Sequence, residues 1–490
     1  MVKHAGFSIH MPSNITRQPA ILIILLSLPF ILWGVCGIGP TFDDYTTLQS
    51  PWYIQISDPG YFFPDAVRRP FDFLLGCIVG WWPALFPVLN HLFIIIGHTL
   101  SALLIFAICK QLNFSSIATN IASIFFFFSP AILGATLACD GFNQTYAQFW
   151  GLLSLWCYLK GKRKLWIACI IMAALSKENG LAWAVVSPVV AYGFGLSIRR
   201  DALRHLGIGL LIAVAYFIIY LTITYTGIIP VEYDEQYMDS SFTDHLKDFA
   251  QLMLYTWVPV DFMSLVYPPT RNWLLVASTL LLSLPFLLLL AGQWRQFRTL
   301  PFLSLVVAFF ILASPHLVTL VSIMHNYAAL SMAAIIVGFI ISNTASYRVK
   351  LLFISFALFL AAALFTDVRH YYAARQSGLT GQRLAMQAIS AAPQPPRHAF
   401  CINIDNEDEP RYSNFCVRPV DAFAWGLAVK HYSHYTWKTT ISEAILSQYN
   451  ERQVTAIADS ALSHGTDVVW VVGHNADSLT IITKQPTIHE

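Results

Sequence analysis

Long apolar stretches alternate with shorter polar ones over most of this chain. A window of about 19 residues with high hydropathy is typical of a helix that crosses a membrane. Windows of this kind predict about eleven spans in an α-helical polytopic membrane protein. They lie near 20–38, 86–109, 116–138, 142–159, 165–176, 179–197, 206–225, 273–292, 301–323, 327–344 and 349–366, the fifth being unusually short.

Two connections between the predicted spans are long and differ in character. The first, 39–85, contains "FDFLLGCIVGWWPALFP", which is apolar but broken by Gly and Pro, so we expect it to lie in the membrane interface. The second, 226–271, contains an acidic stretch followed by "HLKDFAQLMLYTWV". Apolar residues recur there at helical spacing, which predicts a helix resting on the membrane surface.

From Asp367 to Glu490 the pattern is that of a soluble domain. The stretches "RHAFCINID" and "TDVVWVVG" predict strands, and "ISEAILSQYNERQVTAIADSAL" predicts an amphipathic helix. We therefore expect a multi-span domain over 1–366, and a small α/β domain over 367–490 joined to it through "AAPQPPR".

Composition and charge agree with a membrane protein and add an orientation. Of the 490 residues, 56% are hydrophobic and 11% are charged, against about 25% charged in soluble proteins. The net charge is only +2, and this total says little about partners. The first apolar run lacks an A-x-A-like cleavage site and is predicted to be a retained anchor. Most Lys and Arg fall in alternate connections, which places the N-terminus inside and the C-terminal domain outside.

The eight cysteines show no metal-ligand spacing. Six lie in or beside predicted spans, where they are expected to pack. Cys401 and Cys416 lie in the outer domain, in an oxidising compartment, where they form either a disulfide or two free thiols.

Ionisable residues at membrane depth are costly, so each is a candidate functional residue. The topology brings most of them to the outer face, from separate parts of the sequence. They are Asp43, Asp44, Arg68, Arg69, Asp140, Lys177, Glu178, His316 and His325, with His91 and His98 further inside the second span.

The adjacent Asp43 and Asp44 have three interpretations. They form a solvated turn, or they bind a divalent cation through carboxylate oxygens. Alternatively, one carboxylate acts as a general base, because a neighbouring like charge in a partly dry site raises its pKa.

The other candidates also keep two interpretations each. Arg68 and Arg69 either reach lipid headgroups or clamp an anionic group such as phosphate. Lys177 and Glu178 pair with each other, or Lys177 binds a phosphate. The remaining candidates are structural, turn or interfacial residues, or they contact substrate: His91, His98, Asp140, Asn143, Gln144, His325 and Tyr327.

Taken in order, six short motifs resemble those of integral-membrane GT-C glycosyltransferases. They are "FDDY", "RP", "NH" with a second His, "SP", "LSKENG" and "HNY", and they cover roughly residues 20–345. A similar series, with "DD", "RP", "H-x6-H", "KE" and "ERxxY", occurs in transmembrane O-mannosyltransferases and their bacterial relatives. In this chain "HNY" stands in place of "ERxxY". Those O-mannosyltransferases also carry C-terminal TPR repeats, and no TPR-like period is visible in this sequence.

The resemblance implies a GT-C-like fold and inverting transfer of a sugar from a polyprenyl-phosphate carrier to an acceptor outside the membrane. It implies that Asp43 is catalytic with Asp44 beside it, and that Arg69 and Lys177, with Arg68, hold the lipid phosphate. Residues implied to contact substrate are Asp140, Gln144, Glu178, His91, His325 and Tyr327. No cofactor is certain, and a divalent cation remains an alternative. We expect the lipid bilayer, a lipid-linked sugar donor and a glycan acceptor as partners, and no nucleic acid.

In architecture the chain is also similar to serotype-converting O-antigen glucosyltransferases of bacteria. We therefore expect a multi-pass protein of the bacterial inner membrane, with its N-terminus cytoplasmic and its C-terminal domain periplasmic. The expected reaction transfers a hexose, glucose being the first expectation, from undecaprenyl phosphate to an outer glycan such as O-antigen or lipopolysaccharide. A protein O-mannosyltransferase-like enzyme, a flippase for a lipid-linked sugar and an assembly scaffold are the alternatives.

Overall fold

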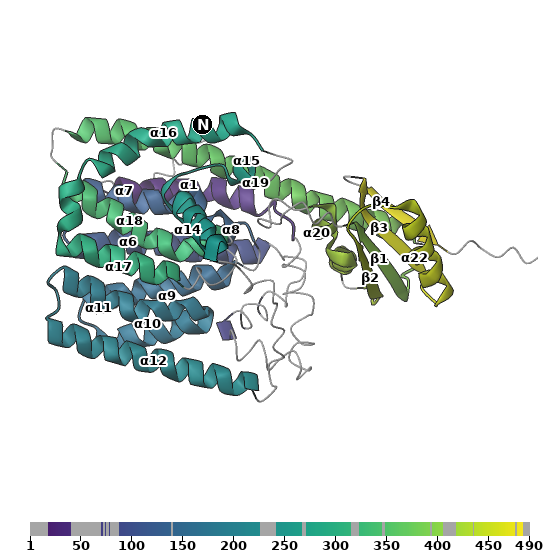
Figure 1. Ribbon diagram of the computed structural model, residues 1–490, viewed down its shortest axis with the longest axis horizontal. Coiled ribbons are helices and arrows are strands. Elements are labelled where there is room, and N and C mark those ends of the chain that lie inside the picture. The colour runs from purple at the N-terminus through teal and green to yellow at the C-terminus, as the bar shows by residue number, and fades with distance from the viewer. Residues whose placement is uncertain are drawn as a thin grey trace, which may run out of the picture.

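The computed structural model shows a bundle of helices and, at one end of it, a small domain built on a sheet (Figure 1). It describes residues 18–40, 70–71, 74, 78, 88–138, 141–225, 242–266, 271–314, 323–344, 348–392, 394–404, 418–434, 436–475 and 478–483. The statements below concern these residues.

Each predicted span corresponds to a helix, or to part of one, at nearly the same positions. The helices of the bundle are α1 Pro19–Val35, α6 Val88–Gln111, α7 Ser116–Phe127, η2 Pro130–Ile132, α8 Leu133–Thr136, α9 Phe142–Leu159, α10 Arg163–Ser176, η3 Glu178–Ala182, α11 Trp183–Gly193, α12 Arg199–Tyr225, α14 Phe242–Trp257, α15 Phe262–Val266, α16 Trp273–Ala291, η5 Trp294–Arg298, α17 Leu300–Ala313, η7 Ile323–His325, α18 Asn326–Ser342 and α19 Val349–Ala391.

Fewer of these helices meet the criteria for a membrane span than the hydropathy pattern predicts. Within the described residues, four helices are long and apolar enough to cross a membrane: Val88–Gln111, Arg199–Thr222, Trp273–Ala291 and Lys350–Ala391. A fifth is added if Ser116–Phe127 and Pro130–Thr136, which meet at 45°, count as one broken span. The chain is thus a membrane protein with several apolar helices, and the expected count of about eleven is not confirmed.

The break in the predicted span 116–138 has a local cause. Pro130 has no backbone N–H to continue the helix, and its ring disfavours helical geometry at the preceding residue. Ser129 is accordingly extended, and its side chain accepts a hydrogen bond from the backbone N–H of Ala131. The chain turns at this point into η2 and the short buried helix α8.

Helix α18 lies at the centre of the bundle and α12 at its edge (Figure 1). Residues 326–341 of α18 are all buried, and the helix packs against α7, α17, α6 and α14. Much of the surface of α12 is exposed and apolar, as expected of a helix that contacts lipid. A helix predicted within 226–271 is present as α14, which packs against α18; its position on the membrane surface stays a prediction.

Helix α19 joins the bundle to the C-terminal domain. It packs against α16 within the bundle, continues as one helix past residue 366, and then packs against α20 and α21 of the domain. Residues near Leu384 and Ala388 of α19 belong to the core of the domain. The same helix therefore belongs to both parts of the molecule.

The C-terminal domain is the predicted small α/β unit. Its sheet has the order β2-β1-β3-β4, with β1 parallel to β2 and β3, and β4 antiparallel to β3. One face carries α19, α20 and α21, and the other carries α22. The elements are β1 His398–Ile404, α20 Pro419–Phe423, η9 Ala424–Gly426, α21 Leu427–Tyr432, β2 Thr440–Leu446, α22 Glu451–Ser463, β3 Val468–Asn475 and β4 Ser478–Thr483.

One expectation for this domain needs correction, and one open alternative is decided for Cys401. The stretch 441–462 is not one helix, because Thr440–Leu446 pairs with β1 as strand β2 and only Glu451–Ser463 is helical. Asn450 separates the two elements, since its side chain accepts from the backbone N–H groups of Arg452 and Gln453 and caps α22. Cys401 is a buried free thiol on β1, which is the second of the two alternatives left open for it, and Cys416 lies outside the described residues.

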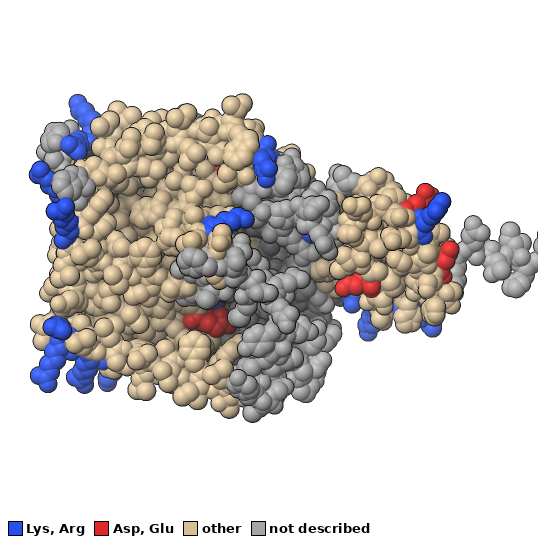
Figure 2. Space-filling view, in the orientation of Figure 1, with Lys and Arg blue, Asp and Glu red and all other residues tan. Residues whose placement is uncertain are grey.

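The two ends of the helix bundle differ in charge. Consecutive spans run in opposite directions, so alternate connections lie together, and Figure 2 shows many Lys and Arg side chains gathered at the end away from the C-terminal domain. We call this the basic end and the opposite one the domain end. Residues in or beside the connections of the basic end are Lys110, Lys160, Lys162, Arg163, Lys164, Arg199, Arg200, Arg204, Arg295, Arg298, Arg348 and Lys350.

Candidate functional site

The connection that follows α1 is held against helix α19 at the domain end. A Cβ atom added to Gly39 would lie 3.0 Å from Cα of Gly378 in α19 and 3.1 Å from the hydroxyl of Tyr432 in α21. The chain therefore passes closely between the bundle and the C-terminal domain immediately before Asp43. The predicted residues Asp43, Asp44, Arg68 and Arg69 themselves lie outside the described residues, as does Asp140.

The short helix α8 is surrounded by buried polar side chains. His91 of α6 is fully buried and hydrogen bonds to the backbone of Thr136. Tyr371 of α19 interacts with the side chain of the same threonine, and it lies near the carboxyl group of Asp367. One carboxyl oxygen of Asp367 is buried and has no hydrogen-bond partner within the described part of the chain. We call His91, Thr136, Asp367 and Tyr371 the α8 cluster.

Lys177 and Glu178 lie where α10 ends and η3 begins. Both side chains are half-buried, and the adjoining Asn179 donates a hydrogen bond of 3.2 Å from its Nδ2 to Oε1 of Gln144 in α9. This turn requires Gly180, because a Cβ there would lie 2.4 Å from the carbonyl oxygen of Ala173. The structure thus brings three predicted site residues, Lys177, Glu178 and Gln144, to one place.

Gln144 is the member of this group with an unsatisfied atom. Its side chain is 3% exposed, and its Nε2 group has no hydrogen-bond partner among the residues that the structure describes. A buried amide donor without a partner is costly, so it is a group that a bound molecule could satisfy. The same is true of the unpaired carboxyl oxygen of Asp367.

Tyr327 and His98 form an internal link between helices. The Tyr327 hydroxyl lies 2.9 Å from Nδ1 of His98, whose Nε2 lies 3.1 Å from the carbonyl oxygen of Phe127. Both residues are buried, which confirms the buried, hydrogen-bonded alternative for His98. Tyr327 therefore joins α18 to α6 and α7, whereas His325, in η7, remains half-buried at the start of α18.

Sequence reasoning did not single out an ion-pair cluster at the domain end. Asp261, in the connection between α14 and α15, is fully buried and contacts Arg369 at 2.7 Å and His370 at 3.2 Å. Burial raises the pKa of Asp261, but the hydrogen bond and charge of His370, the charge of Arg369 and a hydrogen bond from the backbone of Ser264 outweigh it, so the net direction is down. The available signal was "DVRHYY", a set of ionisable residues directly after a predicted span.

Metal binding remains a prediction for the aspartates. Within the described ranges, no group of three or more His, Cys, Asp and Glu side chains is arranged to hold a metal ion. Asp43, Asp44 and Asp140, which would supply carboxylate oxygens, lie outside those ranges.

Comparison with known proteins identifies the fold. No protein-family model and no curated protein matches the sequence. The crystal structure of ArnT from Cupriavidus metallidurans bound to undecaprenyl phosphate is similar, with a TM-score of 0.52 and 11% sequence identity over 94% of this chain and 93% of that one. The archaeal oligosaccharyltransferase AglB from Archaeoglobus fulgidus gives a TM-score of 0.49 with 13% identity over 94% of this chain and 69% of that chain. This chain therefore has the fold of ArnT, which confirms the GT-C-like fold expected from its motif series.

Proposed function

We propose that the chain is a membrane glycosyltransferase that transfers a sugar from a polyprenyl-phosphate carrier to an acceptor on the side of the C-terminal domain. The observation that carries this proposal is the similarity to ArnT, a protein solved with undecaprenyl phosphate bound, over nearly the full length of both chains. A shared fold does not by itself establish a shared reaction. The polar residues at the domain end supply the second line of support for this reaction.

The basic end and the domain end support this orientation of the reaction. An excess of Lys and Arg is typical of cytoplasmic connections, so the domain end would face the periplasm of a bacterial inner membrane. The N-terminus would then be cytoplasmic and the C-terminal domain periplasmic. A carrier lipid would present its phosphate at the membrane surface of the domain end, close to Lys177.

The chemical step needs two kinds of group. Bond cleavage leaves negative charge on the carrier phosphate, which fixed cations stabilise as it develops. Lys177 and Arg69, with Arg68, would supply this charge. Asp43 would remove the proton from the attacking acceptor hydroxyl as a general base, with Asp44 raising its pKa. The sugar passes from the phosphate oxygen to the acceptor oxygen, with inversion at the anomeric carbon.

Contacts at the α10–η3 junction support the position of Lys177. Its half-buried ammonium lies in the same turn as Asn179, which is anchored to Gln144 of α9. The unpaired Nε2 donor of Gln144 would bind a sugar hydroxyl or a phosphate oxygen. We further propose undecaprenyl-phosphate-linked hexose, with glucose as the first choice, as donor and an O-antigen or lipopolysaccharide glycan as acceptor.

The decisive experiment compares envelope glycans in a deletion strain of the native host. The strain is complemented with the wild type, Asp43→Asn, Asp44→Asn, or the control Asp201→Asn, which changes an exposed carboxylate at the basic end. Glycan masses are measured after equal membrane insertion of each variant is verified. We expect the wild type and the control to restore one added hexose per repeat, and Asp43→Asn to fail.

Two results would contradict the proposal. If deletion changes no glycan, the chain is not the proposed transferase. If both aspartate variants restore the glycan fully, the carboxylates do not act as base. A flippase would instead move undecaprenyl-phosphate-glucose across proteoliposomes without consuming it, which a transport assay with the purified chain distinguishes.

A further inference from the structure

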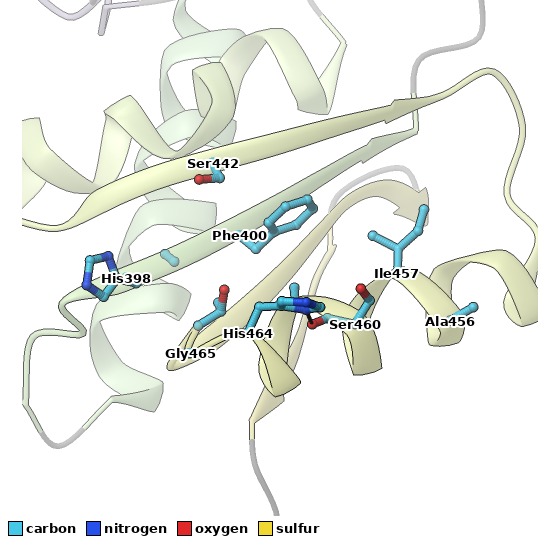
Figure 3. Close-up of a pocket in the computed structure, with 11 residues that line it drawn as sticks. His398, Phe400, Ser442, Ala456, Ile457, Ser460, His464 and Gly465 are labelled. Atoms are coloured by element: carbon cyan, nitrogen blue, oxygen red, sulfur yellow. Dashed lines mark hydrogen bonds between the residues drawn. The ribbon is translucent and has the colours of Figure 1, made fainter.

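A groove lies on the face of the C-terminal sheet that α22 covers only in part (Figure 3). Helix α22 packs against β3 and β1, whereas β2 is the edge strand of the sheet. On this face β2 carries the small side chain of Ser442, in register with Phe400 of β1. The space left between β2 and α22 has a volume of about 730 Å³, within the range of about 300–1,000 Å³ usual for ligand sites.

The groove has an apolar floor and polar edges. Figure 3 shows the ring of Phe400 between β1 and α22, with Ile457 toward one end and His398 toward the other. Hydroxyl groups of Ser442 and Ser460 line opposite sides of it. Phe400 and Ile457 are half-buried, so part of their apolar surface is available to a ligand.

The polar groups in the described lining of the groove are hydroxyls and imidazoles. Of the described residues that line it, none is Lys, Arg, Asp or Glu. The nearby carboxylate of Asp467 accepts hydrogen bonds of 2.7 and 2.9 Å from the backbone N–H groups of Arg397 and His398. A lining without Lys or Arg favours a neutral ligand, because a buried phosphate or carboxylate would need a cation to compensate it.

His464 presents a hydrogen-bond acceptor to the groove. Its Nδ1 lies 2.7 Å from the carbonyl oxygen of Ser460. A carbonyl oxygen can only accept, so Nδ1 carries the proton, and in the neutral form of the ring Nε2 is an acceptor. Together with the serine hydroxyls, which donate and accept, this gives the groove both partners that a sugar hydroxyl requires.

We propose that this groove binds a neutral glycan. An aromatic ring and an aliphatic side chain match the C–H face of a pyranose, and the neutral hydroxyl and imidazole groups match its hydroxyls. A phosphopeptide or nucleic acid would find no Lys or Arg among the described lining residues, and a purely apolar peptide would leave the serine and histidine groups unpaired. Resting on the proposed function, the ligand is a segment of the acceptor glycan.

The position of the groove indicates which part of the acceptor it holds. The opposite face of the sheet packs on α19, α20 and α21, so the groove faces away from the helix that enters the membrane. A sugar bound there lies remote from the reacting hydroxyl. Remote contacts of this kind raise affinity and orient a long substrate, so the enzyme is expected to favour long acceptors over short ones.

The test uses a matched pair of substitutions on α22. Ala456 and Thr455 are adjacent and exposed, but only Ala456 lines the groove. The full chain in nanodiscs is mixed with neutral hexasaccharides of glucose, mannose or N-acetylglucosamine, and with a hexagalacturonate as the charged comparison. Saturation-transfer NMR measures binding. We expect at least one neutral hexasaccharide to bind the wild type and Thr455→Trp alike, and its Kd to rise at least tenfold in Ala456→Trp.

Three results would contradict the proposal that the groove binds a neutral glycan. They are the absence of saturation transfer to every neutral hexasaccharide, an unchanged Kd in Ala456→Trp, or stronger binding of hexagalacturonate than of the neutral sugars. Thermal unfolding of both variants verifies that the domain remains folded.

Failure of the glycan-site proposal can be distinguished from failure of the transferase proposal. Groove substitutions should leave binding of undecaprenyl phosphate unchanged, because the carrier site is in the bundle. If the wild type binds a hexasaccharide through the groove but deletion alters no envelope glycan, the glycan site stands and the transferase proposal fails. If the wild type transfers hexose and Ala456→Trp has an unchanged KM for long acceptors, the transferase stands and the groove proposal fails.

Discussion

The two ends of the helix bundle contain similar residue types in different surroundings. At the basic end the cations lie at helix termini and pack on aromatic rings: the Arg163 guanidinium lies 3.6 Å from the ring centre of Tyr158, and Lys160 and Lys162 lie over Trp156. At the domain end several polar groups are buried or half-buried and contact one another across helices. Asp261 with Arg369 and His370 is the clearest example.

Burial and pairing of polar groups, and not the number of charges, therefore distinguish the domain end from the basic end. Exposed cations at a membrane surface cost little and serve orientation. Burying an unpaired polar group costs on the order of several kcal/mol of folding free energy. Buried polar groups are therefore retained where they stabilise the structure or bind ligands. Pairs of equivalent substitutions at the two ends test this distinction directly.

The largest effect is expected at Lys177. Replacing it with Ala removes a cation that would neutralise the leaving phosphate, and loss of one such group typically lowers kcat by about 10²–10³. Lys164→Ala, at the basic end, changes an exposed lysine and should alter kcat less than about twofold. The assay is hexose release from synthetic undecaprenyl-phosphate-glucose by the purified chain.

Lys177→Arg provides the control for a purely structural role, since it keeps the charge and should restore part of the rate. Equal rates for Lys177→Ala and Lys164→Ala would remove Lys177 from the carrier site.

The sequence predicted well that Lys177 and its neighbours lie at the domain end, for a physical reason. Hydropathy locates a helix because each span must bury its backbone polar groups, and alternate helices then fix which connections share an end. That placed Lys177 and Glu178 at the domain end and allowed Gln144 to be named. It could not show that Asn179 bridges to Gln144, because this contact depends on how α9 and α10 pack.

The second effect concerns the cluster around Asp261. Asp261→Asn removes the charge that pairs with Arg369 and His370, and should lower the free energy of unfolding by about 1.5–3 kcal/mol, the range for a hydrogen bond to a charged group. The control Asp201→Asn lies exposed at the basic end and should change it by less than about 0.5 kcal/mol. Thermal unfolding in detergent at pH 7 measures both.

The pH dependence follows from the lowered pKa of Asp261. Its contribution to stability is present above the pKa of the unfolded chain, about 3.9, and is lost as the pH falls through the still lower value of the folded state. The stability difference between wild type and Asp261→Asn should therefore stay constant from about pH 7 to about pH 5 and shrink below about pH 4. A difference that shrinks instead between pH 7 and pH 5 would contradict the ionised carboxylate.

Three structural features escaped the sequence for a common reason. The Asp261 cluster joins residues more than a hundred positions apart, so no local pattern contains it. Strand β2 was assigned to a helix because Ile441 and Ile445 are also spaced as on a helix, and only pairing with β1 decides between the two. The α8 cluster depends on the bend at Pro130, which brings Thr136 beside α6 and α19.

The smallest effects are expected from two helical glycines, one at each end. A Cβ at Gly378 in α19 would lie 2.4 Å from the backbone nitrogen of Gly39, so Gly378→Ala must displace the segment that leads to Asp43. Such overpacking costs about 1–3 kcal/mol, and the transfer rate should fall with it.

Gly207, near the basic end of α12, has nothing within 4 Å of its added Cβ. Gly207→Ala should therefore stabilise the helix by about 0.5–1 kcal/mol and leave transfer unchanged. Differential scanning fluorimetry and the hexose-release assay measure both variants. If Gly378→Ala instead raises the Tm as Gly207→Ala does, the close packing of the segment after α1 against α19 is wrong, and with it the passage of this segment between the bundle and the C-terminal domain.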